Sequence, residues 1–167
     1  MNPTSADEQL ASRLNLLTER VIGCAFTVGG VLGAGFLERV YENALAHEIR
    51  KAGLRVEQQR RLIVRYDTVE VGEYVADMVV EDLLLIEVKA ARALEAAHEA
   101  QCLNYLTATR LPLCLLFNFG PRVQIRRVVG RHAPQFPIAS PGSPRLVVTP
   151  ETSSTPMTWA ERAELGK

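Results

Sequence analysis

Apolar residues recur along the N-terminal third of the chain with the period of an α-helix. From about residue 6 to about residue 31 they repeat at steps of three and four, and Ser5 and Glu8 form a capping box before them, so a first amphipathic helix is predicted. A second stripe of this kind predicts a helix over about 36–52, closed by Gly53. Four glycines lie where the first helix should end and the chain should turn: Gly29, Gly30, Gly33 and Gly35.

After Gly53 the apolar runs become shorter, and their length and composition are typical of β-strands. An alanine-rich stretch later returns to the helical period. The predicted elements are strands at 55–66 and 69–75, a hairpin over 77–89, a helix at 90–108, and strands at 113–119 and 123–129. This order predicts an α/β fold with a mixed central β-sheet flanked by α-helices.

The hairpin over 77–89 ends in charged residues. Two apolar runs flank a short polar pair near its middle, which predicts two strands joined by a tight turn. Glu87 and Lys89 follow in the second strand. Because successive side chains of a strand point to opposite faces, these two share one face.

Whether Asp77 joins Glu87 depends on the length of the turn. A three-residue connection, 81–83, pairs position 77 with position 87 and sets the two carboxylates side by side, at about 5 Å between Cβ atoms. A two-residue connection puts them on opposite faces, because a shift of one residue inverts the strand. A shared site therefore requires an odd-numbered loop or a bulge.

Two ionised carboxylates at that distance repel each other, so such a site favours a bound cation. Oxygen ligands suit Mg²⁺ or Mn²⁺, and a lysine beside the ion can hold the attacking water while positive charge stabilises a phosphoryl oxygen. The alternative interpretation is structural, because Glu-x-Lys at a strand end is commonly a solvated ion pair that contributes about 0–1 kcal/mol. The residues alone leave both interpretations open.

Composition limits the classes of function. The formal net charge is zero, so affinity for nucleic acid would have to come from a local patch of charge. No apolar stretch is long enough to span a membrane, and the first residues lack a basic segment followed by an apolar one, so a soluble cytoplasmic protein is expected. The three cysteines are scattered among apolar neighbours, which favours buried, reduced thiols over disulfides or a zinc site: Cys24, Cys102 and Cys114.

The composition changes after Arg131, where prolines, serines and threonines become frequent. Such a segment favours a flexible tail over a regular fold. The sequence therefore predicts one domain over 1–131 and a Pro/Ser-rich, flexible tail over 132–167.

Five short motifs follow one another across about two-thirds of the chain. They are Gly35-x-x-Glu38-x-x-Tyr41, Ala76-Asp77, Ile86-Glu87-Val88-Lys89-Ala90, His98-Glu99-Ala100-Gln101-x-x-Asn104-Tyr105-Leu106 and Asn118-Phe119-Gly120. Together they resemble the GxxExxY protein family, a branch of the PD-(D/E)xK nuclease superfamily with RecB-like motifs. The resemblance runs from about Val21 to Val129 and implies a restriction-endonuclease-like core.

The resemblance also implies metal-dependent hydrolysis of nucleic acid, DNA in preference to RNA, and assigns roles to residues of the hairpin. Asp77 and Glu87 would be the ligands of Mg²⁺ or Mn²⁺, with the Val88 carbonyl as a third ligand. Lys89 would position the nucleophilic water and stabilise developing charge. Glu38 would be the acidic residue that many superfamily members place near the metal.

Two helices would supply the remaining site residues that the resemblance implies. Gln101 and Tyr105 would match the superfamily's Gln-x-x-x-Tyr motif, in which the glutamine orients site groups and the tyrosine contacts a phosphate or base. Tyr41, the last residue of the motif that names the family, would bind substrate together with Tyr105.

One segment departs from the family. Its members usually carry Glu-Val-His shortly before the glycines, where this chain has Thr27-Val28-Gly29. In related nucleases a histidine in that region can complete the metal shell, and His98 is the nearest replacement here. Two alternatives to a DNA nuclease therefore stay open: a nucleic-acid-binding protein of the same fold that cleaves weakly or not at all, and an interaction module whose motif residues form a structural ion-pair network.

Overall fold

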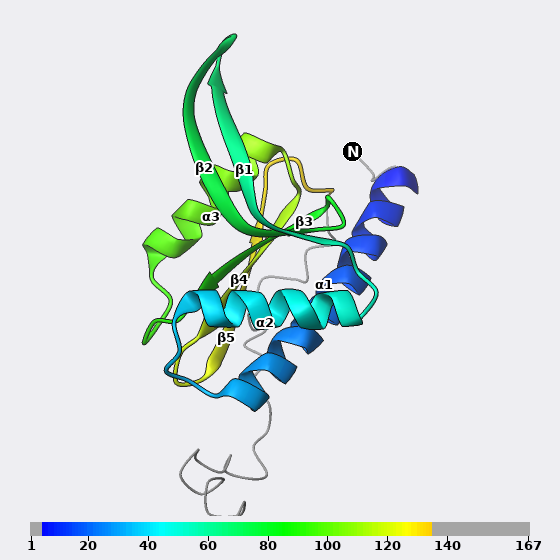
Figure 1. Cartoon of the computed structure of the whole chain (residues 1–167). Helices are drawn as coiled ribbons and strands as arrows, with labels where there is room; N and C mark the ends of the chain where they lie inside the picture. Colours follow the sequence, from blue (N-terminus) through cyan, green and yellow to red (C-terminus); the bar gives the residue numbers. More distant parts are fainter. Residues whose placement is uncertain (1–4, 135–167) are drawn as a thin grey trace, which may run out of the picture.

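The computed structural model describes residues 5–134, which form a five-stranded β-sheet with helices on both faces (Figure 1). The elements are α1 (Ser5–Leu32), α2 (Glu38–Lys51), β1 (Val56–Tyr66), β2 (Val69–Val80), β3 (Leu84–Lys89), α3 (Ala96–Thr109), β4 (Leu113–Phe119) and β5 (Val123–Val129). The strands lie in the order β1-β2-β3-β4-β5, with β3 and β4 parallel and the other neighbours antiparallel. The predicted class, a mixed sheet flanked by helices, is confirmed.

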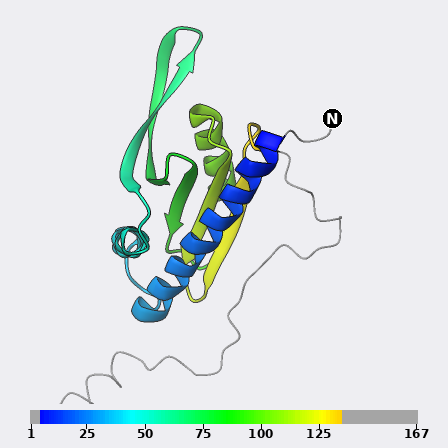
Figure 2. The same cartoon turned by 90° about the vertical axis from the view of Figure 1, so that its right-hand side faces the viewer.

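Two apolar clusters pack against opposite faces of this sheet. In β4, Leu115 belongs to the cluster that α1 and α2 cover, whereas its neighbours Cys114 and Leu116 belong to the cluster under α3. Because successive strand residues point to opposite faces, α3 lies across the sheet from α1 and α2. Figure 2 shows α1 running along its face of the sheet, with α2 seen end-on beside it. The sheet is the middle layer of three.

The N-terminal helices follow the predicted pattern. Leu14, Val21 and Ala25 of the first stripe are fully buried in α1. The chain then turns into α2 through Gly33 and Gly35, whose φ angles are 67° and 109°. Glycine reaches this half of backbone space without steric cost, which explains why the first helix ends at this point.

The β2–β3 hairpin has the odd-numbered loop that a shared site requires. Val80 pairs with Leu84, which leaves 81–83 as a three-residue connection. Continuing this register toward the open end of the hairpin sets Asp77 in line with Glu87. Of the two connections considered from the sequence, the structure contains the one that places both carboxylates on one face.

Strands β1 and β2 extend past the rest of the sheet as a long two-stranded arm (Figure 1). They contain 11 and 12 residues, whereas β3 contains 6. The prediction was wrong in one respect here, because the strand expected to end at Val75 continues through Asp77 to Val80. The polar residue does not break the strand, since β1 pairs with β2 on both sides of it.

Helix α3 begins at Ala96, not at Ala90 as the alanine content predicted. The segment before it is held by Asn118 of β4, whose Oδ1 accepts a hydrogen bond from the Ala91 N–H (2.9 Å) and whose Nδ2 donates to the Ala91 carbonyl (3.0 Å). A residue whose two backbone polar groups are both engaged by a distant side chain cannot use them in a helix. Propensity is overridden here by a tertiary contact.

Three further expectations concern the cysteines, membrane-spanning helices and the C-terminal tail. All three cysteines are buried and free, as predicted. Within residues 5–134, no helix is long and apolar enough to cross a membrane. The predicted tail over 132–167 lies almost wholly outside the described residues, so the domain boundary at 131 stays a prediction.

Candidate active site

Asp77 and Glu87 form the centre of the candidate site. Asp77 Oδ2 accepts a hydrogen bond from the Val88 N–H at 2.8 Å, which ties β2 to β3 just beyond their last paired residues. Glu87 is only 2% exposed, and its Oε2 is buried without a hydrogen-bond partner among the described residues. An unpartnered buried carboxylate oxygen is costly, so this atom marks a position where a cation or a proton would be stabilising.

Lys89 engages the other oxygen of Glu87. Its Nζ lies 2.8 Å from Glu87 Oε1, and the two side chains are 14% and 3% exposed. Two charges removed from water this far are stable only while they stay paired, because breaking such a pair leaves one buried charge uncompensated. The ammonium group is therefore held in a defined place beside both carboxylates.

The surroundings raise the pKa values of the whole group. Burial and the nearby Asp77 charge raise the pKa of Glu87 to about 7, against the lowering effect of its bond to Lys89. Burial also raises the pKa of Asp77, partly offset by its hydrogen bond from Val88. For Lys89, burial acts in the opposite sense, but the hydrogen bond and charge of Glu87 outweigh it and raise the pKa. The cluster therefore carries more negative charge than its own lysine compensates.

Helix α2 adds two more carboxylates near this group. Glu38, at the first residue of the helix, is exposed, and its Oε1 accepts a hydrogen bond from the Ala90 N–H at 3.3 Å. Both Glu38 and Glu42 contribute to raising the pKa of Asp77. The predicted acidic residue of the helix thus lies beside the end of β3, directly after Lys89.

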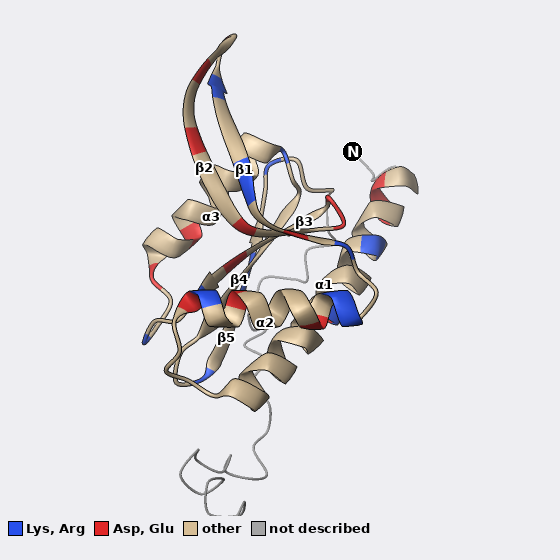
Figure 3. Ribbon diagram, viewed as in Figure 1, with Lys and Arg blue, Asp and Glu red and all other residues tan. Residues whose placement is uncertain are grey.

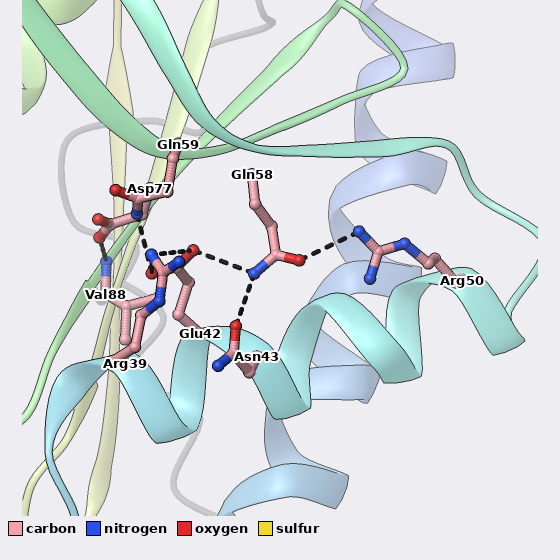
Figure 4. Close-up of polar contacts among 8 residues, drawn as sticks. All are labelled: Arg39, Glu42, Asn43, Arg50, Gln58, Gln59, Asp77 and Val88. Atoms are coloured by element: carbon pink, nitrogen blue, oxygen red, sulfur yellow. Dashed lines mark hydrogen bonds and ion pairs between the residues drawn. The ribbon is translucent and has the colours of Figure 1, made fainter.

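Glu42 was not predicted from the sequence, yet it is the more buried of the two, at 3% exposure. Its carboxylate accepts hydrogen bonds from Arg39 (3.0 Å), Gln58 (3.1 Å) and Gln59 (2.9 Å). Figure 4 shows this group beside Asp77. The network links α2 to β1 next to the candidate site and fixes the helix that carries Glu38.

A signal for Glu42 was present in the sequence. It lies three residues before Leu45 and seven before Ile49, on the apolar stripe of α2, where a carboxylate needs partners. Those partners could not be read from the sequence. One of them, Gln59, has a φ of 54°, a conformation that residues other than glycine rarely adopt, opposite Asp77 in the β1–β2 pair.

Gln101 and Tyr105 come together on α3 as the spacing predicted. The Gln101 Nε2 donates a hydrogen bond to the Tyr105 hydroxyl at 2.7 Å. Burial raises the pKa of Tyr105, the bond from Gln101 lowers it, and the charges of Glu87 and Lys89 also act on it. The tyrosine is only 5% exposed, which leaves little of its ring for a base to stack on.

Tyr41 occupies a different place from the one the resemblance implied. It is fully buried, its ring stacks on Phe119 with 4.7 Å between ring centroids, and its hydroxyl donates to the Gly33 carbonyl at 2.8 Å. The same hydroxyl accepts from the Phe36 N–H. In this structure Tyr41 holds the turn between α1 and α2 and presents no surface to a substrate.

Two residues of the last motif support the strand end that carries Lys89. Asn118 is paired with Lys89 in the β3–β4 register and clamps Ala91, as described above. At Gly120, a Cβ atom would collide with the Ala91 carbonyl oxygen. The sequence marked Asn118 and Gly120 as a motif without a role, and the structure gives them one in positioning the chain after Lys89.

The residues of the candidate site suit a divalent cation that is held by two carboxylates and keeps several of its waters. Within residues 5–134, no three His, Cys, Asp or Glu side chains are gathered in a way that could hold a metal ion. Mg²⁺, however, commonly binds through one or two carboxylates and keeps several waters. Asp77 and Glu87 lie on neighbouring strands, and with the Glu87 Oε2 unpartnered they fit that arrangement.

The two histidine positions considered from the sequence lie apart from this arrangement. His98 caps α3, where its Nδ1 accepts a hydrogen bond from the Glu95 N–H at 3.1 Å. At Gly29, where the family usually has histidine, a Cβ atom would overlap Val123 of β5. Neither position supplies a ligand in this structure.

The mixed five-stranded sheet with helices on both faces is a restriction-endonuclease-like core. A sequence model of the PD-(D/E)XK nuclease superfamily matches residues 15–128, more than half of the chain, and the chain belongs to this superfamily. Membership indicates a nuclease, from a group whose members bind nucleic acid and generally use divalent metal ions. The narrower resemblance to the GxxExxY family stays a prediction.

Comparisons with individual proteins add little detail. A solved structure described as the crystal structure of SSO0001 is similar, with a TM-score of 0.45 and 18% sequence identity over 55% of this chain and 49% of that chain. The chain thus spans about half the length of that protein. A comparison with curated proteins gave no match.

Proposed function

We propose that this protein hydrolyses phosphodiester bonds of DNA with the help of Mg²⁺ or Mn²⁺. The observation that carries the proposal is the pair of carboxylates on neighbouring strands, Asp77 and Glu87, with Lys89 bonded to one oxygen of Glu87 and the other oxygen left unpartnered. Two carboxylates on adjoining strands, Glu87 buried and Asp77 half-buried, repel each other in the absence of a cation. Membership in a nuclease superfamily supports the same chemistry.

In this proposal each residue acts from the place it has in the structure. Asp77 and Glu87 would hold the cation, with the Val88 carbonyl as a further ligand. When bound, the cation would supply positive charge at the scissile phosphate and help to activate water. Lys89, fixed by its bond to Glu87, would orient the attacking water and stabilise negative charge on the phosphate.

The helical residues would complete the site around the substrate. Glu38 lies beside the end of β3 and would orient water or a second ligand there. Gln101 would position the Tyr105 hydroxyl through the bond between them, and that hydroxyl would contact a phosphate. Tyr41 has no substrate-binding role in this proposal, because it is buried in the core.

A second candidate function is nucleic-acid binding with weak cleavage or none. The observation that favours it is at Gly29, where Val123 fills the space that a histidine side chain would need. A cation held by two carboxylates alone would be bound less tightly than one with an added imidazole ligand. Such a protein would bind nucleic acid with an affinity that falls steeply as salt is raised.

Calorimetric titration with Mn²⁺ and Mg²⁺ tests the first proposal directly. The wild type should bind the ion, Asp77→Ala should lose that binding, and Glu73→Gln, which removes a carboxylate on the exposed arm, should retain it. Labelled DNA should then be cut by the wild type in the presence of the bound ion. Equal metal binding by Asp77→Ala and the wild type would contradict the proposed ligands, and DNA binding without metal binding or cleavage would favour the second candidate.

A further inference from the structure

A groove lies between the β1–β2 arm and helix α3, and none of the candidate site's carboxylates lines it. Figure 1 shows α3 beside the lower part of the arm. The groove has a volume of about 520 Å³, within the range of about 300–1,000 Å³ that is usual for ligand pockets. Its lining includes Arg65 and Tyr74 from the arm, Asn104 from α3, and Arg110 just past the end of α3.

Tyr74 connects this groove to the candidate active site. Its ring lies 5.4 Å from the ring of Tyr105, centroid to centroid, at an angle of 47°. The Tyr105 hydroxyl accepts a hydrogen bond from Gln101 of the candidate site, whereas Tyr74 lines the groove. The contact between the two rings therefore places Tyr74 next to a residue of the candidate site, although Tyr105 itself is almost fully buried.

The exposure of the two rings differs in a way that separates their roles. Tyr105 is 5% exposed, but Tyr74 is 46% exposed. Because the rings are tilted and not stacked on each other, Tyr105 does not cover the exposed part of Tyr74. Only Tyr74 offers ring surface on which another planar group can lie.

Polar and basic side chains around the groove suit a nucleotide. Arg110, just past the end of α3, and Asn104 make no side-chain hydrogen bond or ion pair with the described residues, so both can bond to a ligand. Arg65 lies on the arm, where it pairs with Glu70 at 2.6 Å while more than half exposed. Arginines supply the positive charge that a phosphate needs, and an amide can bond to the edge of a base.

We propose that this groove is a subsite for one unpaired base of the nucleic-acid strand, with Tyr74 as the stacking platform and Arg110 and Asn104 as its polar contacts. The inference rests on the proposed function, since it places the groove next to the bond that is cleaved. A base within a duplex already has neighbours on both faces and cannot lie on Tyr74. The subsite therefore favours single-stranded DNA, or a strand end that has opened, over intact duplex.

Binding measured without metal tests the subsite separately from cleavage. The anisotropy of a fluorescent single-stranded oligodeoxynucleotide and of the matching blunt duplex is followed in EDTA for the wild type, Tyr74→Ala and Tyr74→Phe. Tyr66→Ala is the matched control, because Tyr66 is on the same arm, is 77% exposed and does not line the groove. Circular dichroism on each variant checks that the fold is retained.

The expected result is tighter binding of the single strand than of the duplex by the wild type. Tyr74→Ala should weaken single-strand binding roughly 5- to 150-fold, the range typical of losing one base–aromatic stack, while Tyr74→Phe and Tyr66→Ala should bind as the wild type does. Wild-type affinity in Tyr74→Ala would overturn the subsite and leave the proposed nuclease standing. Failure of the wild type to bind either DNA in EDTA would overturn the subsite, whereas the nuclease proposal is overturned separately, if the wild type cuts no labelled DNA with Mg²⁺ or Mn²⁺ present.

Discussion

Two carboxylate–cation pairs in this protein have the same chemistry and opposite behaviour. On the β1–β2 arm, the hydrogen bond from Arg61 holds the pKa of Glu73 below its usual range, and these side chains are 71% and 43% exposed, respectively. In the candidate site, Glu87 is also bonded to a cation, Lys89, yet its pKa is raised to about 7. Figure 3 shows the basic positions on β1 and the acidic positions on β2 along the arm.

Burial and a second carboxylate account for the difference. Water stabilises the charge of Glu73, so the nearby arginine adds to an already favourable state. Glu87 has lost that water and has Asp77 beside it, and a single lysine does not compensate for both. In the Arg61–Glu73 pair the two charges balance each other. Beside the Lys89–Glu87 pair the charge of Asp77 is left unbalanced, so one more cation would be stabilising there.

The largest expected effect is on cleavage. Lys89→Ala should lower the rate of DNA cleavage by about 10²–10³-fold, the usual loss when one group that stabilises the transition state is removed. Glu73→Gln, which breaks the arm pair, should cut at the wild-type rate. Initial rates on labelled DNA with saturating Mg²⁺ or Mn²⁺ measure both, and equal rates for all three proteins would remove Lys89 from the mechanism.

The next largest effect is on how the free energy of unfolding, measured without metal, depends on pH. Because the folded-state pKa of Glu87 is raised from 4.5 to about 7, its contribution to stability is full below pH 4.5 and is lost as the pH rises through about 7. The loss from this group is on the order of 3 kcal/mol. Asp77→Asn removes one cause of the shift and should lessen this dependence, as measured by denaturant unfolding from pH 4 to pH 8.

The sign of that change separates a catalytic cluster from a structural one. Asp77→Asn keeps an oxygen for the Val88 N–H and removes repulsion, so at pH 8 the free energy of unfolding should stay the same or rise. If the motif residues instead form a structural ion-pair network, the same change should lower it by about 3–5 kcal/mol. Asp82→Asn is the control in the same hairpin, because bonds from Arg60 and Arg55 lower the pKa of Asp82 and its pH dependence has the opposite direction.

A smaller effect is expected from adding a methyl group at a glycine, and it should differ between the tightly packed candidate site and the open β1–β2 arm. Gly120→Ala places a methyl group against the Ala91 carbonyl oxygen and should lower the free energy of unfolding by about 1–3 kcal/mol. It should also slow cleavage, because Ala91 follows the strand end that carries Lys89. Gly72→Ala on the arm meets nothing within 4 Å and should leave both quantities nearly unchanged. Equal effects of the two variants would contradict the positioning role of Gly120.

The smallest effect should come from the arm pair itself. Glu73→Gln should change the melting temperature little, because exposed pairs gain little energy in water, and raising the salt concentration should reduce even that change. Thermal unfolding at two salt concentrations measures it. A large loss of stability would mean that the arm pair is part of the core.

Much of the architecture could be predicted from local patterns. The three- and four-residue steps of apolar residues predicted α1 and α2, a short apolar run predicted β4, and alternation predicted β5. The shared face of Glu87 and Lys89 needed only the geometry of one strand, and the Gln101–Tyr105 contact only the geometry of one helix. These features depend on residues close together in the chain, which is why periodicity sufficed.

Features that join distant segments were decided by the tertiary structure. The hairpin loop could have had two or three residues until its register was seen, and the burial of Glu42 depended on glutamines of β1. Tyr41, a motif residue, belongs to the core because Phe119 of β4 packs on it, and Tyr74 borders the site because the arm reaches α3. Local patterns tell which way a side chain points along its own element. Only packing decides which other element it meets, and with that whether its charge or ring is buried or left open to a ligand.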